Sequence, residues 1–172
     1  MAKREYTLPV DAASAREALR SSCALVKRSQ IDDALFRRPD NVSARLRRQD
    51  TVTRLSCTNP GTLAEPPETG VLDYQACSRV LELAGFKPVD RVKFKRETWR
   101  YCQYLLHLDQ TEVLGDYLTA EAEAGTASPH AFRRQVLKSL KNLGILPLEP
   151  NACPVDKQDV YGVDNHSKLP YT

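Results

Sequence analysis

Residues 91–124 read RVKFKRETWRYCQYLLHLDQTEVLGDYLTAEAEA, and this stretch decides the fold prediction. It opens with a segment rich in basic residues, and an apolar segment then leads into His107-Leu108-Asp109. The turn Val113-Leu114-Gly115-Asp116 follows, before a last segment that ends in glutamates. Short alternating segments bounded by turn residues are typical of β-strands. The stretch therefore predicts three consecutive strands.

The flanking sequence predicts further strands and three helices. Strands are expected over 3–9, 30–36, 43–48 and 51–58, with a short one near Val71. Asp11, Asp73 and Ser128 each precede an amphipathic segment and are favoured helix N-caps. They predict helices over 12–27, 74–84 and 129–142. About eight short strands with a few helices indicate an α+β fold built on an antiparallel sheet.

The composition limits the function classes. The 172 residues suit one domain, and 41% apolar residues suffice for a core. A net charge of +3 does not indicate a general nucleic-acid binder. The sequence contains no apolar run long enough to predict a membrane span. The five cysteines are scattered and contain no C-x-x-C pair, which favours a reducing intracellular compartment, either the cytoplasm or the mitochondrial matrix.

The stretch 91–124 resembles the region K-x-R-x-x-W … I-H-L-D-x-V-E-x-L-G-x-F-x-E-x-E of the CYTH family, which contains class IV adenylyl cyclases and thiamine and inorganic triphosphatases. The matching residues are Arg96, Trp99, His107, Leu108, Asp109, Glu112, Leu114, Gly115, Tyr117 and Glu121. The resemblance implies a closed antiparallel β-barrel, the triphosphate tunnel, with helices packed outside. It implies a CYTH-like domain over 1–146, followed by an irregular tail over 147–172.

The resemblance also implies where a triphosphate would bind. The anion requires converging basic side chains. The family's basic positions correspond to Arg45 and Arg47 on one strand, and to Arg96 on another. A register shifted by one residue would direct Lys93 and Lys95 inward instead, so Lys95 is a further candidate, and the sequence leaves both registers open.

The family's paired glutamates hold Mg²⁺ or Mn²⁺, and here each E-x-E pair retains one member. Glu5, Glu68 and Glu121 remain, whereas Lys3, Pro66 and Thr119 occupy the partner positions. Two family lysines correspond to threonines, Thr7 and Thr58. Each lost charge-assisted contact costs about 1.5–3 kcal/mol, and each 1.36 kcal/mol is about tenfold in rate. An eroded catalytic site, without a resident cofactor, is therefore expected.

Three functions follow as hypotheses. The favoured one is a non-catalytic structural or interaction subunit of a larger assembly, contacting protein partners partly through the tail 147–172, which is proline-containing and lacks periodicity. The alternative is a Mg²⁺- or Mn²⁺-dependent triphosphatase or class IV adenylyl cyclase. The third is a non-catalytic binder of polyphosphate, nucleotide or RNA. His107 and Trp99 are interpreted as structural residues.

Overall fold

A computed structural model describes residues 3–60, 66–123 and 128–148. The strands are β1 (Lys3–Pro9), β2 (Ala24–Arg37), β3 (Ser43–Gln49), β4 (Val52–Thr58), β5 (Glu68–Val71), β6 (Lys87–Tyr101), β7 (Tyr104–Thr111) and β8 (Asp116–Glu123). The helices are α1 (Ala12–Ser22), α2 (Tyr74–Leu83) and α3 (Pro129–Asn142). The α+β class and the three strands expected in 91–124 are thus confirmed.

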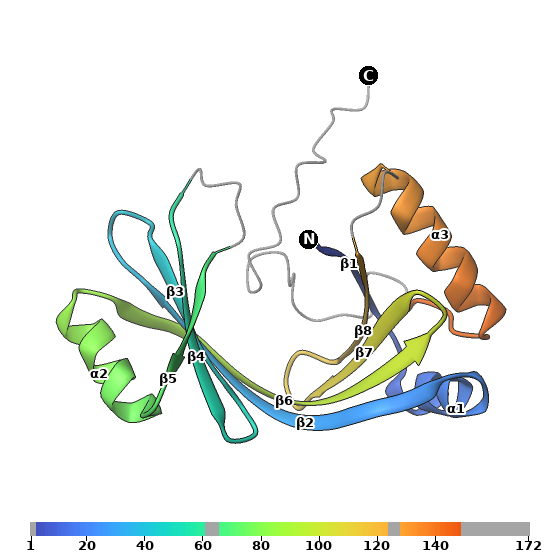
Figure 1. Cartoon of the computed structure of the whole chain (residues 1–172), viewed down its shortest axis with the longest axis horizontal. Helices are drawn as coiled ribbons and strands as arrows, with labels where there is room; N and C mark the ends of the chain where they lie inside the picture. Colours follow the sequence, from blue (N-terminus) through green and yellow to red (C-terminus); the bar gives the residue numbers. More distant parts are fainter. Residues whose placement is uncertain (1–2, 61–65, 124–127, 149–172) are drawn as a thin grey trace.

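All strands belong to one antiparallel sheet of eight strands, in the order β1-β8-β7-β6-β2-β3-β4-β5. The two longest strands, β2 and β6, run side by side along its middle, and the sheet bends into a U (Figure 1). Within the described residues β1 and β5 remain edges that do not pair with each other. The sheet is therefore not closed, and the predicted closed barrel is not confirmed.

Helices cover the outer face of the U at both ends (Figure 1). Beneath α1 and α3 lies a core centred on residues such as Leu19, Trp99, Leu108 and Leu118. A second, smaller core lies beneath α2 and consists of Ala34, Phe36, Ala44, Leu46, Cys77, Leu81 and Phe86. Because most apolar side chains of the strands point to this outer face, the alternating side chains between them form an inner face.

The predicted N-caps are confirmed for all three helices. The side chains of Asp11, Asp73 and Ser128 accept hydrogen bonds from backbone N–H groups three residues further on. The first helix is shorter than predicted, because it ends at Ser22 and not at residue 27. Residues from Ala24 onward instead extend β2, where they pair with β6 opposite Arg100. Tertiary pairing thus overrides the helical spacing of the sequence.

Within the described ranges, no helix is long and apolar enough to cross a membrane. Most of the predicted tail, residues 149–172, lies outside the described part of the chain, and so does the centre of the predicted loop, residues 61–65.

Candidate functional site

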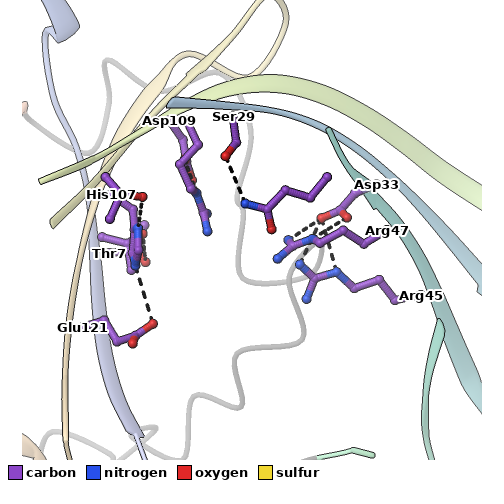
Figure 2. Close-up of polar contacts among 12 residues, drawn as sticks. Thr7, Ser29, Asp33, Arg45, Arg47, His107, Asp109 and Glu121 are labelled. Atoms are coloured by element: carbon purple, nitrogen blue, oxygen red, sulfur yellow. Dashed lines mark hydrogen bonds and ion pairs between the residues drawn. The ribbon is translucent and has the colours of Figure 1, made fainter. Parts of the chain in front are cut away.

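The inner face carries a polar network of separate hydrogen-bonded groups on six strands. Strand register places Thr7, Thr119, His107 and Thr98 in one row and Asp109, Arg96 and Ser29 in the next. Asp33, Arg45 and Arg47 lie on the same face further along β2 and β3, and Figure 2 shows the two groups facing the same space. Polar side chains gather here because most apolar residues of these strands point to the outer core, although Phe94 on β6 points inward.

Asp33 on β2 is the centre of one half of this network. Arg45 Nε and Nη2 donate to its Oδ2 at 3.2 and 3.0 Å, and Arg47 donates from Nε to Oδ1 at 2.7 Å and from Nη2 to Oδ2 at 2.5 Å. Burial raises the pKa of the Asp33 carboxyl, although the charges of Arg47 and Arg96 partly offset this effect. One carboxylate therefore engages two arginines that were predicted to bind phosphate.

Arg96 on β6 is the centre of the other half. Its Nε and Nη2 donate to the two carboxylate oxygens of Asp109 on β7, both at 2.6 Å, in the bidentate geometry of a strong ion pair. Burial alone would lower the pKa of Arg96, but Asp109 and the nearby charges of Glu5 and Asp33 raise it. The guanidinium is therefore fully charged and held by a carboxylate of its own chain.

His107 is held between two strands, as the interpretation of a structural histidine expects. Its Nδ1 lies 3.1 Å from the Thr98 hydroxyl, and its Nε2 lies 3.5 Å from a Glu121 carboxylate oxygen. Burial and the charge of Arg96 lower its pKa, although Glu121 opposes them. The ring is therefore neutral at neutral pH, and these partners fit a tautomer with Nε2–H directed at Glu121.

The predicted phosphate-binding residues are only partly brought together. Strand register places Arg45, Arg47 and Arg96 on the inner face, and Figure 2 labels the first two. Lys95 lies opposite Gln30 and Gln110 and is exposed on the outer face. Of the two registers that the sequence left open, the structure has the one with Arg96 inside. The structure thus separates Lys95 from the three arginines.

The predicted metal-binding glutamates are not gathered. Glu5 and Glu121 are direct partners on β1 and β8. Glu68 lies on β5, the opposite edge of the sheet, where its carboxylate is 3.5 Å from Arg54. Across the described residues, no group of three His, Cys, Asp or Glu side chains could hold a metal ion. The residues present therefore do not fit a carboxylate cage for Mg²⁺ or Mn²⁺.

Two of the positions at which the family has a charged residue, Thr7 and Thr119, are joined here by a neutral hydrogen bond. The hydroxyls of Thr7 and Thr119, which correspond to a family lysine and a family glutamate, lie 2.8 Å apart. They satisfy each other without a phosphate or a metal. Lys3 pairs with Glu123 in the backbone register.

Sequence reasoning missed the role of Asp33. The signal was the pair Asp32-Asp33 within the otherwise apolar segment Ile31–Phe36. Carboxylates are almost never buried unless they are paired, so two of them in an apolar strand indicate cationic partners on both faces. Asp109 belonged to the motif, but its pairing with Arg96 requires the register that the sequence left undecided.

The family profile of the CYTH domain matches residues 3–149. The chain belongs to the CYTH family. Solved structures agree on the fold: a protein from Pyrococcus horikoshii superposes with a TM-score of 0.70 at 17% identity, covering 88% of this chain and 94% of its own. None of the curated proteins matches this CYTH chain significantly.

Two other structures share the CYTH-like fold. A candidate adenylate cyclase from Vibrio parahaemolyticus has a TM-score of 0.66 at 12% identity, over 83% of this chain and 88% of that one. A chain in the Mediator head module of Schizosaccharomyces pombe has a TM-score of 0.57 at 12% identity, over 83% and 96%. At these identities the likeness concerns the fold alone.

Proposed function

We propose that this chain is a non-catalytic CYTH domain that serves as a structural or interaction subunit of a larger assembly. The observation that carries the proposal is the engagement of Arg45 and Arg47 by Asp33. A triphosphate would have to compete with this carboxylate for the two guanidiniums, and Arg96 is held in the same way by Asp109. The phosphate would only replace charge-assisted hydrogen bonds that the arginines already make to Asp33 and Asp109, so the net gain on binding would be small.

The carboxylates on this face add a second argument. Phosphoryl transfer depends on a metal that neutralises charge developing on the phosphate oxygens. Glu5 and Glu121 are adjacent, but Glu68 lies on the far edge strand and is engaged with Arg54. Two adjacent carboxylates in place of three would hold such a metal less firmly, which supports the proposal of a non-catalytic domain. The likeness to a chain within the Mediator head module shows that this fold also occurs inside a multi-subunit assembly.

The catalytic half of the proposal is tested by titrating the full-length protein with tripolyphosphate and with ATP, in the presence and absence of Mn²⁺. Heat and released phosphate are recorded together. We expect no phosphate release above the level of a Glu121→Gln variant. Turnover that Glu121→Gln abolishes would instead establish the alternative function, a metal-dependent triphosphatase or cyclase, which the likeness to an adenylate cyclase candidate favours.

The interaction half is tested by cross-linking in cells, followed by mass spectrometry. The predicted tail over 147–172 contains Lys157 and Lys168, whose amines accept common cross-linkers. We expect cross-links from these lysines to a second polypeptide, and the same partner on repeated purification. A chain that is recovered only as a monomer, with no intermolecular cross-link from either lysine, would contradict the proposal.

Residual binding of polyphosphate or RNA is a second candidate, because three arginines remain on the inner face. Its signature is binding that weakens steeply with salt and that is lost in an Arg45→Ala, Arg47→Ala double variant. The same calorimetric titration detects it as heat without released phosphate.

A further inference from the structure

A hollow of about 600 Å³ lies on the outer side of the sheet, beside α2. Its lining includes Arg48 from β3, Arg91 from β6, and Tyr74, Ser78, Arg79 and Leu83 from α2. This outer pocket lies away from the inner network, because Arg48 and Arg91 project from the face opposite to Arg47 and Asp33. None of the functions proposed for the inner face uses it.

Two arginines of the outer pocket are fixed in place. Arg91 donates from Nε and Nη2 to the two oxygens of Asp32 at 2.8 and 2.7 Å, and Arg48 donates to the same carboxylate at 3.2 Å. Both guanidiniums also lie over the ring of Tyr74, at 5.3 Å for Arg48 and 5.6 Å for Arg91. Their side chains nevertheless remain 48% and 51% exposed. They are thus oriented in advance but still accessible to a ligand.

The cluster has more positive charge than its own carboxylate can neutralise. The hydrogen bond from Arg91 and the charges of Arg91, Lys93 and Arg48 hold the pKa of Asp32 low, against the effect of burial. One carboxylate thus faces three cations. Arg79 adds another positive charge on the pocket wall, opposed there by Glu82. The inner face differs, because Arg45 and Arg47 are only 33% and 18% exposed there.

The margin of the outer pocket is apolar. Leu83 lines the pocket and is 81% exposed, and Val80 on the same helix is 62% exposed. Leu72, just before α2, is fully exposed. Exposed leucines beside a basic hollow suit a ligand that carries both acidic and apolar groups.

We propose that the outer pocket is a docking site for an acidic peptide segment of a partner protein, whose carboxylates contact Arg79, Arg91 and Arg48 while an apolar side chain packs on Leu83. The inference deepens the proposed interaction role and rests on it. A protein segment fits better than a nucleic acid, because the Tyr74 ring is covered by guanidiniums and is not free to stack on a base. It fits better than a membrane surface because the site is a hollow, which a side chain of a peptide can enter and a flat membrane surface cannot.

The test measures fluorescence anisotropy of a short fluorescein-labelled peptide of glutamate and leucine on the full-length protein. A matched peptide with glutamine in place of glutamate is the ligand control. We expect binding to the glutamate peptide that weakens as salt is added, and at least tenfold weaker binding to the glutamine peptide. Equal binding of both peptides, or no binding to either, would overturn the proposal.

Two variants locate the site. Arg79→Glu and Leu83→Ser alter exposed side chains on α2. The first is expected to weaken peptide binding about tenfold because it removes a charge-assisted contact, and the second by about the same factor because it removes apolar contact area. Arg91 is left intact, because its removal would strand the buried Asp32. The control is Arg134→Glu on α3, at the other end of the sheet, which should retain binding. An equal loss in all three variants would refute a specific site.

Two further arms separate this proposal from others. Vesicles that contain phosphatidylserine and a single-stranded RNA are titrated in parallel, and preference for either over the glutamate peptide would refute a peptide site. The tripolyphosphate titration is repeated on Arg79→Glu and should be unchanged. Failure of the docking site is therefore distinguishable from failure of the proposed non-catalytic role, which depends on the inner face.

Discussion

Replacement of Asp33 by asparagine tests whether the inner arginines are held from within. The change keeps the size of the side chain but removes the negative charge that Arg45 and Arg47 contact through four hydrogen bonds of 2.5–3.2 Å. If this carboxylate takes the place of a phosphate, its neutralisation should release both guanidiniums. Affinity for tripolyphosphate should then increase while stability decreases.

The two effects can be estimated from the structure. Breaking a fully buried ion pair costs about 3–5 kcal/mol. Here the cost should be nearer to 1–2 kcal/mol, because the Arg45 and Arg47 side chains are 33% and 18% exposed and can reach water. The change also removes the burial penalty that raises the pKa of Asp33. In binding, one additional charge-assisted phosphate contact of about 1.5 kcal/mol corresponds to roughly tenfold tighter affinity.

Isothermal calorimetry with tripolyphosphate and urea denaturation measure the two quantities on the same protein. The matched control is Asp40→Asn, whose carboxylate pairs with Arg38 on an exposed turn and should affect neither. Unchanged or weaker tripolyphosphate binding in Asp33→Asn would refute the idea that Asp33 blocks an anion site. If Asp40→Asn increased the affinity for tripolyphosphate by the same factor, the gain in Asp33→Asn would be explained by the change in net charge alone.

Three further predictions concern stability. Burial lowers the pKa of His107, so the unfolded chain takes up a proton at a higher pH than the folded chain does. The free energy of unfolding should therefore fall as pH decreases below about 6.5. Urea denaturation at several pH values should show a weaker pH dependence for His107→Gln. Burial alone would raise the pKa of Glu97, but the hydrogen bonds and charges of Arg16 and Arg28 outweigh it and lower the pKa. The contribution of Glu97 to the stability of the fold is therefore present above about pH 4.5 and is lost in stronger acid. Glu97→Gln should lower the free energy of unfolding by about 1–2 kcal/mol at neutral pH in the same denaturation assay. Leu108→Ala, at a fully buried position, should cost about 2–5 kcal/mol, whereas Leu72→Ala should remain within about 0.5 kcal/mol in the same denaturation assay.

Local patterns were sufficient to predict most elements. The alternation within 91–124 predicted β6, β7 and β8, and the residues Asp11, Asp73 and Ser128 located the helix starts, because both signals act over a few neighbouring residues. Closure of the sheet could not be derived in this way. Six strands lie between β1 and β5, and the bend of all of them decides whether these two edges meet. A motif of a few neighbouring residues does not determine that bend.

The register of β6 could not be predicted for a different reason. Burial normally identifies the face of a strand, but on β6 the outer apolar core includes Trp99 and none of the residues 93–97. Over 93–97 the outer side carries Lys93, Lys95 and Glu97, and the inner side carries Phe94 and Arg96. Charged residues therefore occur on both faces, and alternation contains no hydrophobic signal to choose between them.

The adjacent residues Asp32 and Asp33 connect the two sides of the sheet. Successive side chains of a strand point to opposite faces, so one dipeptide of β2 places a carboxylate on each side. On the inner side Asp33 engages Arg45 and Arg47, whose side chains are largely shielded from solvent. On the outer side Asp32 orients Arg48 and Arg91 but leaves positive charge in excess. The outer arginines are about half exposed, at 48% and 51%, whereas Arg45 and Arg47 on the inner face are 33% and 18% exposed. An anionic partner would therefore reach the outer arginines more readily than the inner ones.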